Sequence, residues 1–401
     1  MKILHIVTAF PRTEEDIITP WLVEMLKHSQ DRGLEPEVYA SSYRGLGDQV
    51  VHGLPVHRFR YFFKRWENLT HEETTPDRMK KSLLYRMMPA CYIIGGMIGI
   101  VKLLRKNQYD AVHVHWPLPH ALFGWVAQRF FGLPVVTTFY GVELRWVKRS
   151  MPLLKGFLAW SARMSQRVVA ISNYTAKEIK ELADVPVEVI PYTISLPENT
   201  DFSAPPEGPK IILSVSRLVE RKGIIYLIDA LKYLPEELDV HLAIIGDGPE
   251  RERLKDRAIS QGLGRRVSMP GWVSESDLEH AYRNAAVFVL PAIIDSKGDT
   301  EGLGVVLLEA MNYKVPAIGS ELGGITDIII NEKTGLLVPE KDPKALAKAI
   351  TRILTDENLR TKVTEGAYQH LKRNFSWGNI LEKWENIYGN LYTENKKQNF
   401  T

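Results

Sequence analysis

Short apolar runs rich in branched residues alternate with longer amphipathic segments, and this alternation constrains the fold more than any other feature of the chain. In the first half the runs are KILHIV, EVYA, AVHVH, VVTTF, VVAIS and VEVI, with a helical stretch expected from Trp21. Buried parallel strands are near-continuous hydrophobic runs, and helices connect them. The pattern therefore predicts an α/β fold with a parallel sheet covered by helices.

The alternation breaks at Pro205-Pro206-Glu207-Gly208-Pro209, where neither a strand nor a helix can continue. A second series of strands begins directly afterwards with KIILSVS, and helices are expected over 224–234, 250–262, 275–285 and 304–313. A chain of 401 residues also exceeds the roughly 250 to 300 residues of a single core. The predicted parts are a first domain over 1–204, a linker over 205–209, a second domain over 210–374 and a final apolar-striped helix over 375–401.

Composition narrows the class of protein. A formal net charge of only +3 argues against a dedicated nucleic-acid binder. The single cysteine, Cys91, cannot form an internal disulfide, and no signal peptide is recognisable. The longest uncharged stretch, residues 87–101, is shorter than the roughly 20 residues that cross a bilayer. We therefore expect a cytoplasmic protein.

The second series contains the clearest chemical signals, in the turns that follow its strands, where open parallel sheets bind ligands. The first turn places Arg217 at a strand exit and Lys222 five residues later, with Arg221 between them. Fixed positive charges there suit a diphosphate leaving group. The alternative is a solvated basic turn, and Arg221 is the residue most expected to face solvent only.

Two further turns are open to two interpretations. Gly246 and Gly248 flank Asp247, so this turn can approach a ligand closely or serve only as a tight turn before a helix. Trp272 and Val273 can present an aromatic edge and backbone groups to a base, although a packed Trp is the commoner case.

The fourth turn, Glu301-Gly302-Leu303-Gly304, leads into an almost entirely apolar helix. Its unblocked N–H groups and helix dipole make a phosphate site. Glu309 within that helix requires hydrogen-bond donors, which a ribose diol would supply. Eight positions along a helix span about 12 Å, so Glu301 and Glu309 should have separate duties, with Glu301 near the transferred sugar.

These motifs together resemble the retaining glycosyltransferases of family 4, which have the two-Rossmann-domain architecture called GT-B. The matching segments, in the family's order, are SRLVERKG, GDGPE, EGLGVVLLE, GGITDII and TGLLVP. The resemblance covers about residues 210 to 340 strongly and the first domain more loosely, through VHVHW.

The resemblance implies a role for each matched residue. Arg217 and Lys222 would hold the diphosphate, Glu309 the ribose and Glu301 the donor sugar, with backbone contacts from Gly302, Leu303 and Gly304. It implies catalysis without a metal or other cofactor, retention of the anomeric configuration, and a last helix, from about Trp377, that crosses back onto the first domain. The chain itself shows no convincing metal-ligand spacing, since His113 and His115 are only a same-face pair.

The first domain departs from the family. Where many relatives carry a histidine followed by glycine, this chain has Tyr140-Gly141-Val142-Glu143. Tyr140 could donate a hydrogen bond to the donor sugar, but a phenol with a pKa near 10 is a poor general base. His115 and Glu143 are the candidates on the acceptor side. The glycine pair that relatives often show after strand one is replaced by residues 11–21.

Two segments of the first domain mix cations with apolar or aromatic residues, namely 58–66 and 78–88. Basic amphipathic surfaces attract anionic membranes and would place the enzyme, peripherally, at the inner face beside a lipid-linked acceptor. A strand and a helix with snorkelling charges would give the same pattern.

The sequence therefore predicts a hexosyltransferase that uses a UDP-, GDP- or ADP-sugar and a carbohydrate or lipid-linked acceptor, in surface polysaccharide or glycolipid synthesis. Two alternatives stay open. One is a sugar-nucleotide 2-epimerase of the same double architecture. The other is a non-catalytic sugar-nucleotide or glycan-binding module, because Tyr140 occupies the histidine position.

Overall fold

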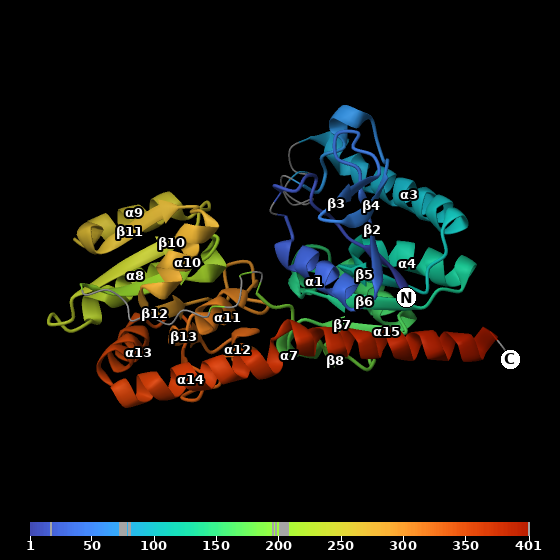
Figure 1. Ribbon diagram of the computed structural model, residues 1–401. Coiled ribbons are helices and arrows are strands. Elements are labelled where there is room, and N and C mark those ends of the chain that lie inside the picture. Colours follow the sequence, from blue (N-terminus) through green and yellow to red (C-terminus); the bar gives the residue numbers. More distant parts are fainter. Residues whose placement is uncertain are drawn as a thin grey trace. The chain divides into compact units, whose positions relative to one another are not determined.

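The computed structural model describes residues 1–16, 18–71, 78, 82–194, 196, 199 and 208–399 (Figure 1). Contacts divide the chain into two compact units. The first contains 1–171, 175–195 and 377–401, and the second contains 172–174 and 196–376. This division passes between Ser195 and Leu196, upstream of the predicted linker, and residues 205–207 of that linker lie outside the described residues.

The first unit is built on an eight-stranded sheet of order β3-β4-β2-β1-β5-β6-β7-β8. Every neighbouring pair is parallel except β3 and β4. The strands are β1 (Lys2–Ile6), β2 (Glu35–Ser41), β3 (Gln49–Val51), β4 (Leu54–Phe59), β5 (Ala111–His115), β6 (Val135–Phe139), β7 (Arg167–Ala170) and β8 (Glu188–Val189). Strands β3 and β4 were not predicted, because Pro55 and charged residues interrupt the pattern of apolar residues in this segment.

The helices of this part of the chain are α1 (Pro20–Asp31), α3 (Leu83–Lys106), α4 (Pro117–Phe131), α5 (Val142–Ser150), α6 (Lys155–Met164) and α7 (Asn173–Leu182), with short 3-10 turns η1 (Lys64–Trp66) and η2 (Pro152–Leu154). Helix α3 extends well beyond the uncharged stretch at 87–101 on both sides. The uncharged stretch is therefore part of a longer helix of 24 residues, whose most apolar window has a mean hydropathy of 1.8 and which qualifies as a membrane span by length and composition only.

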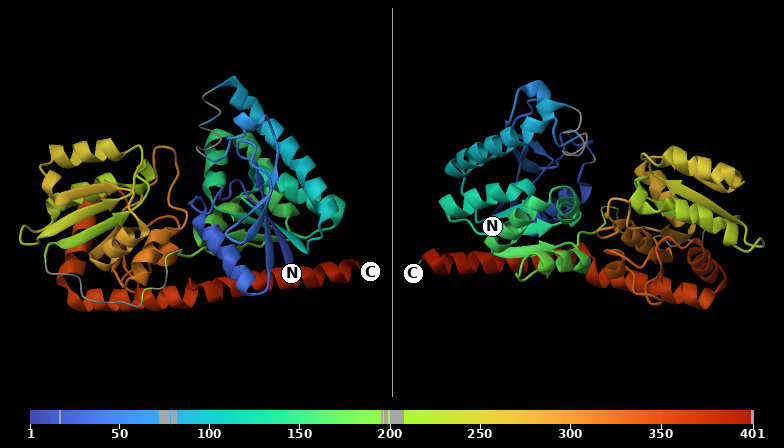
Figure 2. Two further views of the ribbon diagram at one scale, coloured as in Figure 1. Left: turned by 45° about the horizontal axis from the view of Figure 1, so that its top comes forward. Right: turned by 180° about the vertical axis from the view of Figure 1, so that it is seen from behind.

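The last helix, α15 (Trp377–Asn399), belongs to the first unit, as the family resemblance implies (Figure 2). Its predicted apolar stripe is buried there, and Ile380, Trp384, Ile387 and Tyr388 join a cluster with residues of α1, β1 and β2. The burial of this stripe removes apolar surface from water, which is the main term that holds the helix in place.

The second unit has a six-stranded, all-parallel sheet of order β11-β10-β9-β12-β13-β14. Its strands are β9 (Lys210–Val215), β10 (Val240–Ile245), β11 (Val267–Gly271), β12 (Ala285–Leu290), β13 (Ala317–Ser320) and β14 (Leu336–Val338). All six lie on short apolar runs of the sequence, namely IILSV, HLAIIG, RVSMPG, VFVLP, VPAIGS and GLLVP.

The helices of the second unit are η3 (Glu220–Lys222), α8 (Ile224–Ala230), η4 (Leu231–Tyr233), α9 (Arg251–Ser260), η5 (Gly264–Arg266), α10 (Glu275–Arg283), α11 (Val305–Asn312), α12 (Ile325–Ile328), α13 (Pro343–Thr355) and α14 (Glu357–Asn374). The four predicted helices agree with them within a few residues, except that the segment expected as one helix over 224–234 is divided into α8 and η4. Helices α12, α13 and α14 were not predicted.

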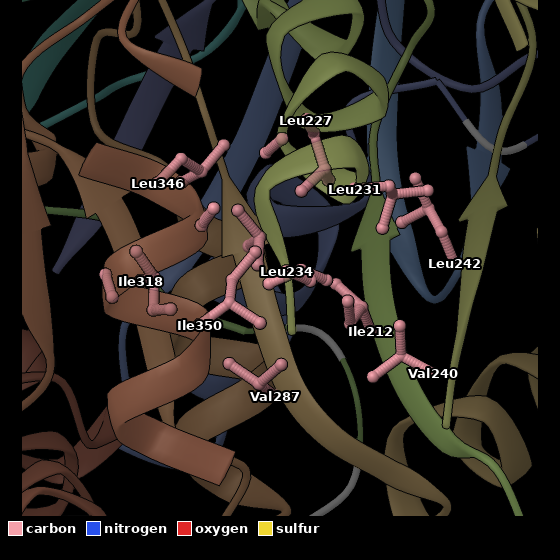
Figure 3. Close-up of a cluster of buried hydrophobic side chains, with 14 of the residues drawn as sticks. Ile212, Leu227, Leu231, Leu234, Val240, Leu242, Val287, Ile318, Leu346 and Ile350 are labelled. Carbon is pink, nitrogen blue, oxygen red and sulfur yellow. The ribbon is translucent and has the colours of Figure 1, made fainter. Parts of the chain in front are cut away.

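The core of the second unit lies between this sheet and helices α8 and α13. Figure 3 shows Ile212 and Val287 of neighbouring strands facing Leu227 and Ile350 of those helices. Aliphatic side chains fill this layer almost completely, so the strand ends that it supports are held firmly. Both units together confirm the predicted α/β class.

Candidate functional site

The sheet of the second unit reverses its direction of winding between β9 and β12. From β9 the chain adds β10 and β11 toward one edge of the sheet. It then crosses back to add β12, β13 and β14 on the other side of β9. Open α/β sheets bind ligands at the carboxyl ends of such strands. The turn after β9 carries Arg217 to Lys222, and the loop after β12 carries Glu301. The two predicted motifs therefore meet at the position in this fold where a ligand is expected.

The cations and the carboxylate of these two loops are joined in a buried cluster. The Lys222 ammonium donates a hydrogen bond to Oε2 of Glu301, and Nη1 of Arg221 donates to the same oxygen at 3.1 Å. Lys222 and Glu301 are 8% and 7% exposed. Burial alone would raise the pKa of Glu301, but the charges of Lys222 and Arg221 outweigh it and lower this pKa to about 2. Glu301 is therefore ionised at neutral pH.

The expectation that Arg221 faces solvent only is wrong. Its guanidinium pairs with Glu301 and lies 3.6 Å from Asp299, and its carbonyl accepts a hydrogen bond from the N–H of Ile293. The planar guanidinium reaches two carboxylates that a flexible lysine would not hold together. Arg217, by contrast, is exposed at the exit of β9 and takes no part in the pairing of Glu301. Its predicted contact with the diphosphate stays a prediction.

Glu309 of α11 has a protein partner that the sequence did not reveal. Tyr282, fully buried in α10, donates a hydrogen bond of 2.6 Å to Oε2 of Glu309. Burial raises the pKa of Glu309, while Tyr282 and the charge of Lys222 act in the opposite direction. Lys222 thus influences both carboxylates. Glu301 precedes α11 in an extended turn, so the helical estimate of about 12 Å between the two carboxylates does not apply.

The glycine-rich turns are packed on one another by close backbone contacts. A Cβ atom at Gly248 would lie 2.3 Å from the carbonyl oxygen of Leu218, and one at Gly324 would lie 2.1 Å from that of Gly302. The Gly324 N–H also donates to the carbonyl of Glu301 at 3.0 Å. GGITDII therefore supports the turn before α11, and GDGPE supports the basic turn. Such contacts tolerate only glycine.

The remaining predicted donor-binding positions lie at the same strand ends. Gly246 follows β10 with φ of 121°, Gly304 begins α11 with φ of 94°, and Leu303 is buried between Gly302 and Gly304. Trp272 follows β11 and is 69% exposed, so the packed-core alternative for this residue is wrong, whereas Val273 is half-buried. An exposed indole beside a ligand-binding sheet edge is available for stacking.

In the first unit a chain of buried histidines ends at Tyr140. Nδ1 of His5 lies 3.1 Å from Nε2 of His115, and Nδ1 of His115 lies 2.8 Å from the Tyr140 hydroxyl. His5 was missed by the sequence analysis, although it is the register partner of His113 on the neighbouring parallel strand. Burial lowers the pKa of His5 to about 3 and that of His115 well below its ordinary value, so the chain is neutral.

His113 is held in the same way by the hydroxyls of Tyr388 and Thr138, each 2.7 Å from one ring nitrogen. The ligand nitrogens of His5, His113 and His115 all lie within 4.8 Å of one another, so the predicted pair is a cluster. Hydrogen bonds already use both nitrogens of His113 and of His115. This donor set fits a hydrogen-bonded network better than a metal centre.

Glu143 and Tyr140 adjoin one another at the start of α5. Oε1 of Glu143 accepts a hydrogen bond of 2.8 Å from the Tyr140 N–H, while its buried Oε2 has no partner among the described residues. Burial raises the pKa of Glu143 to about 7 and the pKa of Tyr140 well above its ordinary value. Tyr140 therefore stays a neutral hydroxyl, and Glu143 titrates near neutral pH.

Aromatic rings that the sequence analysis passed over surround Tyr140. Trp116 stacks on it with ring centroids 4.3 Å apart, and Trp21 lies 5.2 Å from it. A pocket next to these rings is lined by Trp21, Tyr140, Tyr192, Trp377 and Trp384. Trp116 has a φ of 55°, which is unusual for a bulky residue and is found preferentially at functional sites.

The predicted membrane segment at 58–66 is only partly on the surface. Arg58 lies in β4 next to its last residue and is 6% exposed, and its guanidinium donates to the carbonyl of Pro11 at 2.6 Å. Arg60 pairs with the buried Glu67. The exposed residues of this segment are Arg60, Phe63, Lys64 and Arg65.

In the second predicted membrane segment, Arg78 is buried as well. Residues 79–81, which include Lys80 and Lys81, lie outside the described residues, and 83–88 form the start of α3. The interpretation of both segments as continuous basic surfaces is therefore wrong for Arg58 and Arg78.

Two family models match the two halves of the chain. The model described as "Glycosyl transferases group 1" matches residues 197–370, and that described as "Glycosyltransferase Family 4" matches residues 21–196. The UDP-Gal:alpha-D-GlcNAc-diphosphoundecaprenol alpha-1,3-galactosyltransferase of Escherichia coli is 30% identical, over 67% of this chain and 74% of that protein.

Among solved structures, sucrose-phosphate synthase from Thermosynechococcus elongatus aligns with a TM-score of 0.74 at 21% identity, covering 98% of this chain and 99% of that one. Anabaena HepE in complex with UDP and glucose aligns with a TM-score of 0.70 at 17% identity, covering 97% and 99%. These structures support the fold, and the family models support the activity class. The chain therefore belongs to the family 4 glycosyltransferases, enzymes of the GT-B fold.

Proposed function

We propose that the enzyme transfers a hexose, with retention of configuration and without a metal ion, from a nucleoside-diphosphate sugar to a hydroxyl acceptor in the synthesis of a surface polysaccharide or glycolipid. The observation that carries this proposal is the Lys222–Arg221–Glu301 cluster at the switch point of the second sheet. Fixed cations at that point suit the additional negative charge that a departing diphosphate develops.

A diphosphate bound there would compete with Glu301 for Lys222 and Arg221. As long as Lys222 and Arg221 stay beside it, the Glu301 carboxylate is ionised and can only accept hydrogen bonds. It would therefore hold hydroxyls of the transferred sugar and stabilise positive charge at its anomeric carbon, rather than act as an acid. Oε1 of Glu309 makes no hydrogen bond with the described residues, so it remains for a ribose hydroxyl, as the family resemblance implies.

UDP is the nucleotide we favour among UDP, GDP and ADP. The Escherichia coli relative is named for UDP-Gal, and the Anabaena structure holds UDP. The same relative is named for a diphosphoundecaprenol acceptor, which supports a lipid-linked acceptor. The relatives are named as transferases, so they do not favour the 2-epimerase alternative.

The test begins with a thermal-shift series using UDP, GDP and ADP, because a ligand that binds the native state raises the melting temperature. Release of nucleoside diphosphate from the matching hexose donor then measures turnover, and NMR of the product measures its anomeric configuration. Lys222→Ala should abolish the shift and lower turnover by about a hundredfold or more. Lys232→Ala, on an exposed lysine of η4, is the control.

Interconversion of intact donors without release of nucleoside diphosphate would establish the epimerase. A shift with UDP but no turnover with any hexose donor and lipid-linked acceptor would contradict the proposal and favour the binding module. Full turnover by Lys222→Ala would remove the assignment of the site.

A further inference from the structure

Helix α3 carries an exposed apolar stripe that nothing in the first unit covers among the described residues. Leu83, Met87, Ile94 and Ile98 are 72%, 65%, 59% and 51% exposed. Their spacings of four, seven and four residues place them on one side of the helix, in line with the exposed Ala90. An aliphatic stripe of several turns is a costly feature in water unless a partner covers it.

The opposite side of α3 is fixed to the first unit. Met88, Tyr92 and Ile100 are buried in the cluster formed with β2, β4 and α4. A Cβ atom at Gly96 would lie 2.2 Å from the Phe123 ring, and the Gly96 carbonyl accepts a hydrogen bond of 2.7 Å from the Tyr39 hydroxyl. The helix has the length and composition of a membrane span, yet 33% of its most apolar window is buried inside the unit. It is therefore held flat on the protein with one face outward.

The charges of α3 complement an anionic surface. Residues Leu83–Lys106 contain no Asp or Glu, whereas Arg86 lies near the start and Lys102, Arg105 and Lys106 lie at the end. The exposed turn Phe63-Lys64-Arg65 continues the same character beside the first turns of α3, since Trp66 contacts Tyr85 with ring centroids 6.3 Å apart. Apolar residues with cations at both ends match a helix lying in the interface of a bilayer.

We propose that the outward face of α3, together with Phe63, docks in the plane of an anionic lipid bilayer, with the stripe among the acyl chains and the flanking cations at the headgroups. A protein groove would bury the stripe equally well, but it would not require cations at both ends and no acidic residue along 24 positions. The surface shares no residue with the nucleotide site, so it can fail independently of the proposed function.

The test is flotation of the full chain with vesicles of phosphatidylcholine mixed with phosphatidylglycerol, compared with phosphatidylcholine alone. We expect the wild-type protein to float with the anionic vesicles, less so as salt is raised. Ile94→Glu/Ile98→Glu should lower the bound fraction about tenfold or more, because two carboxylates would enter the apolar layer. Ile259→Glu, on a side chain of α9 that is 69% exposed in the second unit, is the matched control and should bind like the wild type.

Lys102→Glu/Arg105→Glu keeps the stripe and reverses two charges. This variant should lose the preference for anionic vesicles. It tests the proposal even if Ile94→Glu/Ile98→Glu has a lower melting temperature than the control. Equal flotation of both variants and the wild type, equal binding to both vesicle types, or no flotation at all would each overturn the proposal. So would a dimer that Ile94→Glu/Ile98→Glu converts to a monomer, because a second copy would then cover the face. The UDP-dependent thermal shift must survive in every variant, which separates this result from the test of the nucleotide site.

Discussion

At the scale of single residues, the two carboxylates of the candidate sites differ because their neighbours differ. Glu301 meets two cations and is ionised, whereas Glu143 meets a backbone N–H on one oxygen and none of the described donors on the other. Both are almost completely buried. Desolvation is therefore common to both groups. The direct pairs with Lys222 and Arg221 outweigh it at Glu301, whereas the charge of Arg145 does not outweigh it at Glu143.

Removing the charge of Glu301 should destabilise the protein. In Glu301→Gln the buried Lys222 loses its counter-charge, so we expect the free energy of unfolding in urea to fall by about 3 kcal/mol at neutral pH. Glu250→Gln, which breaks a surface pair with Arg253, should change it by less than about 0.5 kcal/mol.

The pH dependence of that loss has a defined sign. The pKa of Glu301 is about 2 in the folded protein against 4.5 ordinarily, so its stabilisation is complete above 4.5 and disappears as the pH falls toward 2. The difference between wild type and Glu301→Gln should therefore shrink in acid. A constant difference between about pH 7 and pH 3 would contradict this pairing.

Glu143 should give the opposite pH profile. Its pKa rises from 4.5 to about 7 on folding, so the folded protein holds the proton more tightly and loses stability as the pH rises through this range. Glu143→Gln should remove that loss and be more stable than the wild type at about pH 8, by the order of 1 to 3 kcal/mol. Chemical denaturation across pH measures it, with the exposed Glu236→Gln as control. Parallel pH profiles of wild type and Glu143→Gln would contradict the prediction.

At the scale of elements, the turn before α11 depends on a second turn packed directly behind it. Gly324→Ala would push a Cβ atom against the carbonyl of Gly302, so we expect a loss of about 1 to 3 kcal/mol in stability and a smaller UDP-dependent thermal shift. Gly389→Ala in α15 meets nothing within 4 Å and should instead stabilise by about 0.5 to 1 kcal/mol. An unchanged nucleotide shift in Gly324→Ala would show that this support is not needed.

The strands of the second unit could be predicted from sequence because they are continuous aliphatic runs separated by glycine-rich turns, whereas helices α12, α13 and α14 were not predicted. The hairpin of β3 and β4 could not, since its edge position allows Pro55 and charged side chains that hide the alternation. Within the site, Lys222, Glu301 and Glu309 carried visible signals. Tyr282 and Arg221 did not, because their roles follow from tertiary contacts between residues far apart in sequence.

At the scale of the whole molecule, the chain enters the first unit, builds the second, and returns to the first through α15. This path makes the first unit discontinuous in sequence and gives the second unit a core of its own. The family assignment rests on the second unit's motifs and both family models, whereas the acceptor side has few sequence signals. The histidine and aromatic residues of the acceptor side are brought close to one another by the register of β1, β5 and β6, which the sequence does not give.

Truncation after Ser376 tests this organisation. It would remove Trp384, Ile387, Tyr388 and Leu391 from the core of the first unit, and each large core side chain is worth about 2 to 5 kcal/mol, so that unit should no longer unfold cooperatively. The second unit keeps its own core and the Lys222–Glu301 cluster, so a protease-resistant fragment within 208–376 that still shows a UDP-dependent thermal shift is expected. Trp384→Ala offers a milder form of the same change. If the truncated chain melted in one transition at the wild-type temperature, α15 would contribute nothing to the first core, and its buried stripe would need another explanation.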